Sequence, residues 1–227
     1  MPSRISVIIP AFNEEQSIGL VLDALPQDQI HEIIVVDNNS TDNTARSAIE
    51  KGARVVVEKR RGYGSACLKG ISELDSPHIV VFVDGDFSDY PEEIVKLVAP
   101  IEAGEMDFVL GSRMILPESR SALLPQSRYG NQLAVFLIRL FFHHSYTDLG
   151  PFRAIRYDSL KSIGMQDTNF GWTVEMQIKA VKKGLRILEV PVKYRERIGV
   201  SKITGTFSGT IKAGTKIIYT IFKYLIT

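Results

Sequence analysis

Short apolar runs alternate with helix-like segments along the first half of the chain. Each run is rich in valine and isoleucine, as expected for strands that are buried on both faces of a sheet. The segments between them carry helix start signals or the spacing of amphipathic helices. The runs occupy residues 5–10, 32–36, 53–57, 79–83 and 108–110, and the helical segments occupy residues 14–25, 39–51, 62–74 and a stretch that begins at Pro91. This alternation predicts a Rossmann-like α/β sandwich of three layers, with a mostly parallel sheet between two layers of helices.

The second half of the chain follows a different pattern. A long, largely apolar helical segment covers residues 125–143, and a shorter helix covers residues 172–183. Residues 147–155 are expected to be extended or looped, and residues 185–190 are predicted as one more strand. Because no repeat or low-complexity linker separates the two halves, the second half is expected to complete a single domain.

The last residues form a basic amphipathic pattern. Lys212, Lys216 and Lys223 alternate there with isoleucine, phenylalanine and leucine side chains. A helix of this kind binds anionic membrane surfaces, and packing on the domain or contact with a second copy of the chain are the alternatives. We therefore divide the chain into a domain at residues 1–205 and a C-terminal amphipathic helix at residues 206–227.

Composition and charge exclude several classes of protein. The 227 residues include 27 basic and 26 acidic side chains, whereas a dedicated nucleic-acid binder carries a clear basic excess. Cys67 is the single cysteine, so a reducing compartment such as the cytoplasm is expected. No signal peptide is expected, and no apolar stretch approaches the ~20 residues of a spanning helix. Membrane contact would then be peripheral, at the cytoplasmic face.

Acidic side chains follow three of the predicted strands. Glu14 lies just past the first strand, Asp37 ends the second, and Asp84 and Asp86 follow the most apolar strand. Ligands of open α/β sheets bind at the carboxyl ends of the strands. Two carboxylates in one turn suit Mg²⁺ or Mn²⁺, with phosphate oxygens and water as further ligands. An ordinary Asp-Gly turn with solvated carboxylates is the alternative, and the place of this turn after a buried strand favours the metal site.

Five ordered motifs resemble those of the family 2 glycosyltransferases. The first three are VIIPAFNE at residues 7–14, VVDNNSTDNT at 35–44 and VDGDFSDYPE at 83–92. The motifs GSR at 111–113 and GVSK at 199–202 resemble those of the branch that contains the dolichol-phosphate mannose and glucose synthases. Because these motifs occur in the family's order along most of the chain, the sequence is identified as a member of this family.

The resemblance implies a GT-A fold with a mixed sheet, in which residues 1–205 form the catalytic domain. The implied reaction is metal-dependent transfer of a hexose from GDP-mannose or UDP-glucose to a polyprenyl (dolichyl-type) phosphate, with inversion at the anomeric carbon. Ser88 stands where some relatives have a third metal ligand. The residues carried over to the donor side are Pro10, Phe12, Glu14 and Asp37 for the base and ribose, and Asp84, Gly85 and Asp86 for the metal ion and the diphosphate.

Basic residues after the later strands are candidates for contact with the diphosphate. At the end of a predicted strand, Arg113 could grip a phosphate oxygen in bidentate fashion, and the resemblance favours this over a surface ion pair. Either Arg195 or Arg197, together with Lys202, resembles the segment that closes over the donor, and a charged surface loop is the alternative. At a glycine-rich helix start, Gly64 would let the backbone approach an anion, which is weighed evenly against a flexible basic turn.

Two acidic residues lie where the family places the acceptor side. These residues, Asp148 and Glu175, complete with Asp86 and Arg113 the predicted catalytic set. A sugar hydroxyl acceptor needs a carboxylate base, whereas a polyprenyl phosphate is already anionic and needs none. Glu175 stays open as a base, an acceptor contact or a helix residue that faces water, and Asp148 has the greater weight for a role in the site.

Three other functions compete with transfer to a lipid phosphate. Transfer to a saccharide or other hydroxyl acceptor would use one of these two carboxylates as the base. A nucleotidyltransferase shares the strand–helix alternation, but it wants a glycine-rich loop with a basic residue after the first strand, which residues 10–14 lack. A non-catalytic module that binds sugar nucleotides is disfavoured by the intact carboxylate pair.

Asp86→Ala is expected to abolish hexose transfer while the fold survives, because the turn loses one of its two metal ligands. The measurement is a transfer assay, paired with circular dichroism to verify folding. Full activity in the folded variant would contradict the metal-site prediction.

Overall fold

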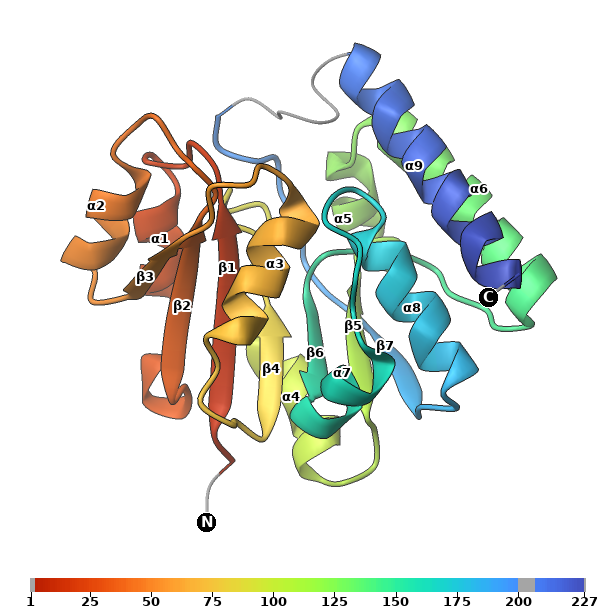
Figure 1. The fold of residues 1–227 in the computed structure, drawn as a ribbon, viewed down its shortest axis with the longest axis horizontal. Coiled ribbons are helices and arrows are strands. Elements are labelled where there is room, and N and C mark those ends of the chain that lie inside the picture. Colours follow the sequence, from red (N-terminus) through yellow and green to blue (C-terminus); the bar gives the residue numbers. More distant parts are fainter. Residues whose placement is uncertain (1–2, 200–206, 227) are drawn as a thin grey trace.

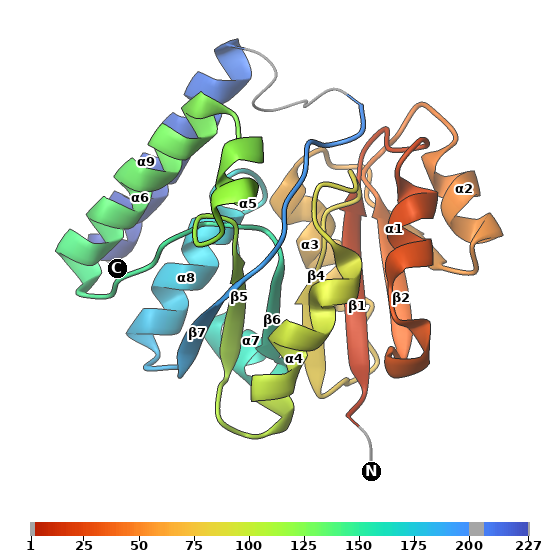
Figure 2. The same cartoon turned by 180° about the vertical axis from the view of Figure 1, so that it is seen from behind.

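The computed structural model of the protein describes residues 3–199 and 207–226. Its centre is a seven-stranded sheet with the order β3-β2-β1-β4-β6-β5-β7, seen from the two sides in Figures 1 and 2. The strands are β1 (Ile5–Ala11), β2 (Glu32–Asp37), β3 (Arg54–Val57), β4 (Ile79–Phe82), β5 (Phe108–Ser112), β6 (Arg153–Arg156) and β7 (Ile187–Pro191).

One strand runs against the others. β6 is antiparallel to both of its neighbours, β4 and β5, while β1–β2, β1–β4, β2–β3 and β5–β7 pair in parallel. The mostly parallel mixed sheet predicted from the sequence is confirmed. The stretch expected to be extended or looped at 147–155 contains the start of β6, which no local pattern distinguishes from a loop.

Helices cover both faces of the sheet. Two of them, α5 and α7, were not predicted, because six or seven residues carry too little helical periodicity. The helix expected over 125–143 ends at Phe142, since His143 takes a left-handed φ of 55°. The helices are α1 (Ile18–Ala24), α2 (Thr44–Glu50), α3 (Tyr63–Ser72), α4 (Ile94–Glu102), α5 (Pro117–Ala122), α6 (Pro125–Phe142), α7 (Tyr157–Ile163), α8 (Trp172–Lys182) and α9 (Phe207–Ile226), with 3₁₀ turns at Gln27–Gln29 and Pro91–Glu93.

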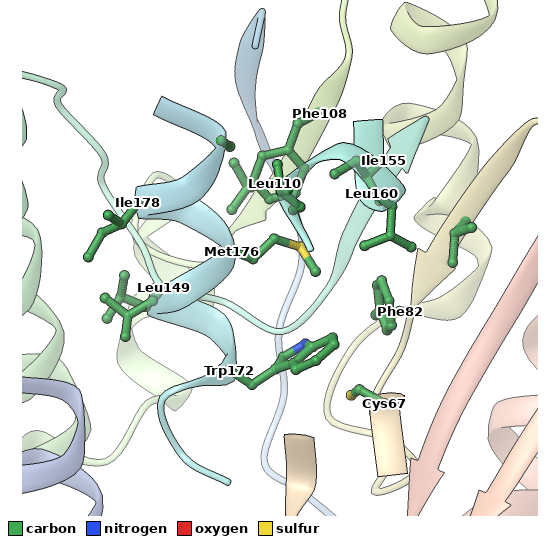
Figure 3. Packing of buried hydrophobic residues seen from close by; sticks show 14 of the residues in the cluster. Cys67, Phe82, Phe108, Leu110, Leu149, Ile155, Leu160, Trp172, Met176 and Ile178 are labelled. Atoms are coloured by element: carbon green, nitrogen blue, oxygen red, sulfur yellow. The ribbon is translucent and has the colours of Figure 1, made fainter. Parts of the chain in front are cut away.

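The alternation of side chains along β1 divides the core into two parts. Val7 and Ile9 point to the side of α1 and α4, and Ile8 points to the side of α3 and α8. On this second side the ring of Trp172 meets Phe82 edge to face, with centroids 5.8 Å apart, as Figure 3 shows. Aromatic pairs of this geometry add to the burial of their area, so they join α8 firmly to the centre of the sheet.

The predicted C-terminal helix is α9, which lies along α6 at one end of the sheet (Figures 1 and 2). The rings of Phe141 and Phe222 meet at 5.4 Å, and Lys182 on α8 donates a hydrogen bond to the carbonyl of Tyr224. Helix α9 therefore packs on the domain as well as presenting an outer face. None of the helices within the described residues is long and apolar enough to cross a membrane.

Candidate functional site

A pocket of about 310 Å³ opens at the carboxyl ends of β1, β2 and β4. This is the edge where parallel strands bring their following loops together. Its walls come from six parts of the chain: the end of β1 with the segment after it, the residue after β2, the start of α3, the turn after β4, the loop before α8 and the segment after β7. The lining residues are Pro10, Ala11, Phe12, Glu14, Asn38, Arg61, Gly62, Tyr63, Ala66, Asp84, Gly85, Asp86, Asn169, Phe170 and Arg197.

The turn after β4 carries the two predicted metal ligands. Asp84 accepts a hydrogen bond of 3.0 Å from the hydroxyl of Tyr63 on α3. Asp86 accepts hydrogen bonds from the backbone N–H and the hydroxyl of Ser88, at 3.0 and 2.6 Å. Phe87, which lies between Asp86 and Ser88, has a φ of 61°. This left-handed conformation costs energy in a bulky residue and is typical of functional turns. The turn is thus held in a shape that a free chain would avoid.

Burial and mutual repulsion dominate the electrostatics of this turn. Burial, and then the charge of Asp86, raise the pKa of Asp84 to about 7. A third carboxylate, Asp89, is 1% exposed, and neither of its carboxylate oxygens has a hydrogen-bond partner among the described residues. Burial and the charge of Asp84 raise the pKa of Asp89 well above its ordinary value. The site therefore concentrates negative charge in a desolvated place, which favours a cation.

The residues present fit a divalent metal ion. Asp84 and Asp86 both face the pocket and offer hard oxygen ligands. Within residues 3–199 and 207–226, no group of three or more histidine, cysteine, aspartate or glutamate side chains is arranged to hold a metal. Two carboxylates with an open pocket beside them suit Mg²⁺ or Mn²⁺, whose other ligands are substrate phosphates and water.

The late basic segment runs beside this turn. Arg197 pairs with Asp86 at 3.1 Å and with Glu14 at 2.5 Å, and it lines the pocket. Arg195 instead lies over the ring of Phe87 at 3.5 Å and donates to the Phe87 carbonyl at 2.7 Å. Of the two arginines that the sequence left open, the structure brings Arg197 into the pocket and sets Arg195 behind the turn. Lys202 lies outside the described residues.

Two of the predicted catalytic residues form a buried ion pair with each other. Arg113 donates to both carboxylate oxygens of Asp148, at 2.8 and 2.9 Å, and its backbone N–H donates to the same group at 2.9 Å. Burial opposes the charge on each partner, but the pair more than offsets it, so the pKa of Arg113 is raised and that of Asp148 is lowered. Asp148 is therefore ionised, and both of its carboxylate oxygens accept hydrogen bonds from Arg113.

The residues predicted to contact the nucleotide base and ribose lie at the ends of β1 and β2. Pro10, Phe12 and Glu14 line the pocket, and the guanidinium of Arg61 stacks over the Phe12 ring at 3.8 Å. Asp37 is buried beside the pocket and accepts the backbone N–H of Ser40 at 3.1 Å. Asp37 thus shapes the turn after β2, while its neighbour Asn38 faces the pocket.

Gly64 and Glu175, like Asp37, Arg113, Asp148 and Arg195, do not line the pocket. A side chain added at Gly64 would place its Cβ 2.0 Å from the carbonyl oxygen of Asp167, so this glycine allows backbone contact between α3 and the loop before α8. Glu175 is fully buried in α8 and faces α9, where the hydroxyl of Tyr224 donates to it at 2.6 Å. Neither residue is part of the pocket wall.

Of the pocket residues outside the predicted set, the polar or aromatic ones are Asn38, Arg61, Tyr63, Asn169 and Phe170. Asn38 directly follows Asp37 at a strand end, so its position held a usable signal. Tyr63 and Arg61 stand in the glycine-rich helix start, which was considered only for its backbone. The last two lie in a loop before α8, more than 80 residues from the acidic turn, where no local pattern indicates a site.

Comparison with known proteins agrees with the geometry. The model of the family "Glycosyl transferase family 2" matches residues 6–164. A dolichyl-phosphate hexose transferase of Haloferax volcanii is 32% identical over 94% of this chain and 92% of its own length. An undecaprenyl-phosphate mannosyltransferase of Micrococcus luteus is 31% identical over 91% of this chain and 90% of its own length.

A solved structure is similar throughout the fold. Glucosyl-3-phosphoglycerate synthase of Mycobacterium tuberculosis, in complex with Mn²⁺, UDP and glucosyl-3-phosphoglycerate, superposes with a TM-score of 0.81. It is 25% identical and covers 98% of this chain and 80% of its own.

The mixed sheet with its pocket at the strand ends is the GT-A fold of nucleotide-sugar-dependent enzymes. The chain belongs to glycosyltransferase family 2 and is a glycosyltransferase. Nucleotidyl transfer and a non-catalytic role, the alternatives considered from the sequence, do not apply.

Asp84→Asn should stabilise the metal-free protein strongly at pH 8 and clearly less at pH 5. The folded-state pKa of Asp84, about 7, lies above the ordinary value of 3.8. The folded protein therefore holds a proton that the unfolded chain releases, and the free energy of unfolding falls as pH rises from about 4 to 7. The asparagine escapes this loss, a gain of roughly 2–4 kcal/mol at pH 8. Urea unfolding in EDTA at both pH values measures it, and equal effects at the two pH values would contradict it.

Proposed function

We propose that this glycosyltransferase moves a hexose from GDP-mannose or UDP-glucose to a polyprenyl phosphate, with inversion at the anomeric carbon. Two relatives that align over nine tenths of the chain are named for transfer to dolichyl phosphate and undecaprenyl phosphate. The solved neighbour holds Mn²⁺ and UDP in the same fold. These similarities support a nucleoside-diphosphate sugar as donor and a lipid phosphate as acceptor.

The donor half of the proposal rests on the pocket. Phe12 offers a flat apolar wall for the base, and Glu14 and Asp37 offer oxygen acceptors for ribose or base donors. A Mg²⁺ or Mn²⁺ ion held by Asp84 and Asp86 would neutralise the departing diphosphate. Arg197, already on Asp86, stands where its guanidinium can bind a diphosphate oxygen. Gly85 lines the pocket beside the two carboxylates, whereas Gly64 and Arg195 would support the site from behind its wall. A contact of Lys202 with the donor stays a prediction from the sequence.

The proposed class of acceptor rests on the contacts of the two carboxylates that were predicted as bases. Asp148 is held on both oxygens by Arg113, and Glu175 is fully buried on the side of α9. Neither carboxylate is placed to remove a proton from a hydroxyl group in the pocket. A phosphate acceptor needs no such base, because its oxygen is already anionic. This observation favours a polyprenyl phosphate over a saccharide.

Transfer to a hydroxyl acceptor is the second candidate. The solved neighbour in this fold is bound to glucosyl-3-phosphoglycerate, a product in which the sugar is carried by a small phosphorylated acid. An acceptor of this kind would require Asp148 to leave Arg113 and act as the base.

The outer surface of α6 and α9 is suited to peripheral contact with a membrane. Tyr129, Leu133, Phe136 and Leu140 follow one another at helical spacing on α6 and are 48–73% exposed. Helix α9 adds exposed large apolar residues: Ile211, Tyr219, Phe222, Leu225 and Ile226. Exposed Arg139 and Lys212 supply positive charge for anionic lipids. A lipid-linked acceptor would meet the enzyme at such a surface, and a contact between two copies of the chain is the alternative.

Donor and acceptor can be identified in one series. Purified protein is expected to gain roughly 5–10 °C in Tm with its correct sugar nucleotide at about 100 times Kd, and only with Mn²⁺ present. The same donor should then transfer its hexose to undecaprenyl phosphate in detergent, giving the inverted anomer by NMR. Asp86→Ala is the control for the metal-dependent shift. Transfer to 3-phosphoglycerate or a saccharide, with none to the lipid phosphate, would overturn the acceptor assignment.

Phe136→Glu should weaken transfer to an acceptor embedded in anionic vesicles by roughly tenfold, since it places a charge in the middle of the apolar stripe of α6 and removes an exposed aromatic ring. Transfer to a short, water-soluble polyprenyl phosphate should not change. Gln29→Glu adds the same charge at an exposed position of the 3₁₀ turn Gln27–Gln29, away from α6, and is the matched control. Equal vesicle activity in the two variants would argue against membrane contact through this face.

A further inference from the structure

Glu175 lies in an unusually complete set of hydrogen-bond donors. Its side chain is fully buried in α8, yet it receives the backbone N–H groups of Gln166 and Asp167 at 3.0 and 2.6 Å. The hydroxyl of Tyr224 on α9 donates at 2.6 Å, and Lys179 pairs with it at 2.8 Å. A buried carboxylate is tolerated only when its charge is paired and its oxygens are bonded. The Glu175 carboxylate therefore connects three parts of the chain: α8, α9 and the loop that contains Gln166 and Asp167.

The loop between α7 and α8 is clamped from its other side as well. A Cβ on Gly62 would lie 2.2 Å from the carbonyl oxygen of Thr168, so α3 and the loop touch through their backbones. The same carbonyl accepts the backbone N–H of Ser65 at 2.9 Å. The loop is therefore in close contact with the start of α3 on one side and with α8 and α9 on the other. A change in its position would require one of these helices to move.

Helix α9 makes a second attachment to this loop. Lys216 pairs with Asp167 at 2.7 Å. The other oxygen of Asp167 accepts the backbone N–H groups of Asn169 and Gly171, at 2.7 and 3.2 Å, and so shapes the turn. A Cβ on Gly171 would lie only 2.5 Å from the hydroxyl of Thr220. Helix α9 thus contacts both ends of the turn that carries Asn169 and Phe170.

Asn169 and Phe170 are pocket residues, whereas Glu175 itself is not. We propose that Glu175 is a positioning residue that couples the docking of α9 to the shape of the pocket, by holding the loop from Gln166 to Gly171 against Tyr224. The C-terminal helix is then a working part of the donor site. This role differs from a catalytic base, because all four contacts of the carboxylate are turned toward structure rather than substrate.

Tyr224→Phe removes the hydroxyl that links α9 to Glu175 and keeps the ring. Tyr219→Phe, at an exposed tyrosine of the same helix, is the matched control. Amide exchange at Gln166 and Asp167 should become roughly threefold faster or more in Tyr224→Phe, and about 10- to 100-fold faster in Glu175→Gln, which weakens the charge-assisted bonds to both amides. Trp172, the single tryptophan, follows the loop directly and should become more accessible to acrylamide quenching in both variants. Exchange rates like those of Tyr219→Phe would overturn the coupling.

The link to the pocket is tested with UDP and GDP in the presence of Mn²⁺. Whichever nucleotide binds should show a dissociation constant raised roughly threefold or more by Tyr224→Phe and by Lys216→Met, while Lys216→Arg, which keeps the ion pair, restores it. With an active donor, KM should rise and kcat should stay within about twofold, a split that general destabilisation would not produce.

Faster exchange with unchanged nucleotide affinity would overturn the role in the pocket. This second test rests on the proposed function, whereas the exchange and fluorescence measurements do not, so failure of one is distinguishable from failure of the other.

Discussion

Two carboxylates at the end of a buried strand repel each other in the wall of a pocket. The continuous apolar strand β4 carries Asp84 and Asp86 to the centre of the sheet edge, where burial raises the pKa of Asp84 to about 7. Such an arrangement is costly for the fold on its own, because Asp84 is desolvated beside a second carboxylate. The ionised form of both carboxylates becomes favourable when a cation, either an arginine side chain or a metal ion, lies beside the two groups.

The surrounding chain responds to this charge in two ways. The segment after β7 runs along the acidic turn, so that Arg197 reaches Asp86 from more than 100 residues away. Tyr63 reaches Asp84 from the start of α3. Arg113 is kept from the carboxylates of the turn by its own partner, Asp148. Arg197 thus lies on the carboxylate of Asp86 while Arg113 is held in a separate buried pair, and a donor diphosphate would redistribute the contacts of these two arginines.

The second wall of the pocket depends on packing rather than on charge at the strand ends. The loop before α8 lies between glycines of α3 and the last helix, and it brings Asn169 and Phe170 to the pocket opposite the segment after β1. Because α9 also carries the exposed apolar side chains proposed to meet a lipid surface, one helix connects the outer surface of the protein to its site. A glycosyltransferase with a lipid-linked acceptor would benefit from that connection, since both substrates must be engaged at once.

The sequence by itself determined six of the seven strands, the mostly parallel character of the sheet and the acidic residues at the strand ends. These features depend on local periodicity and on the rule that parallel strands end at one edge, so Glu14, Asp37, Asp84 and Asp86 were found without coordinates. Only the tertiary structure placed Arg197 rather than Arg195 in the pocket wall, paired Asp148 with Arg113, and turned Glu175 toward α9. It also decided that β6 runs antiparallel and that the loop before α8 reaches the pocket. Each of these outcomes depends on which side chains meet across large separations in the chain, and no periodicity or neighbouring residue encodes that choice.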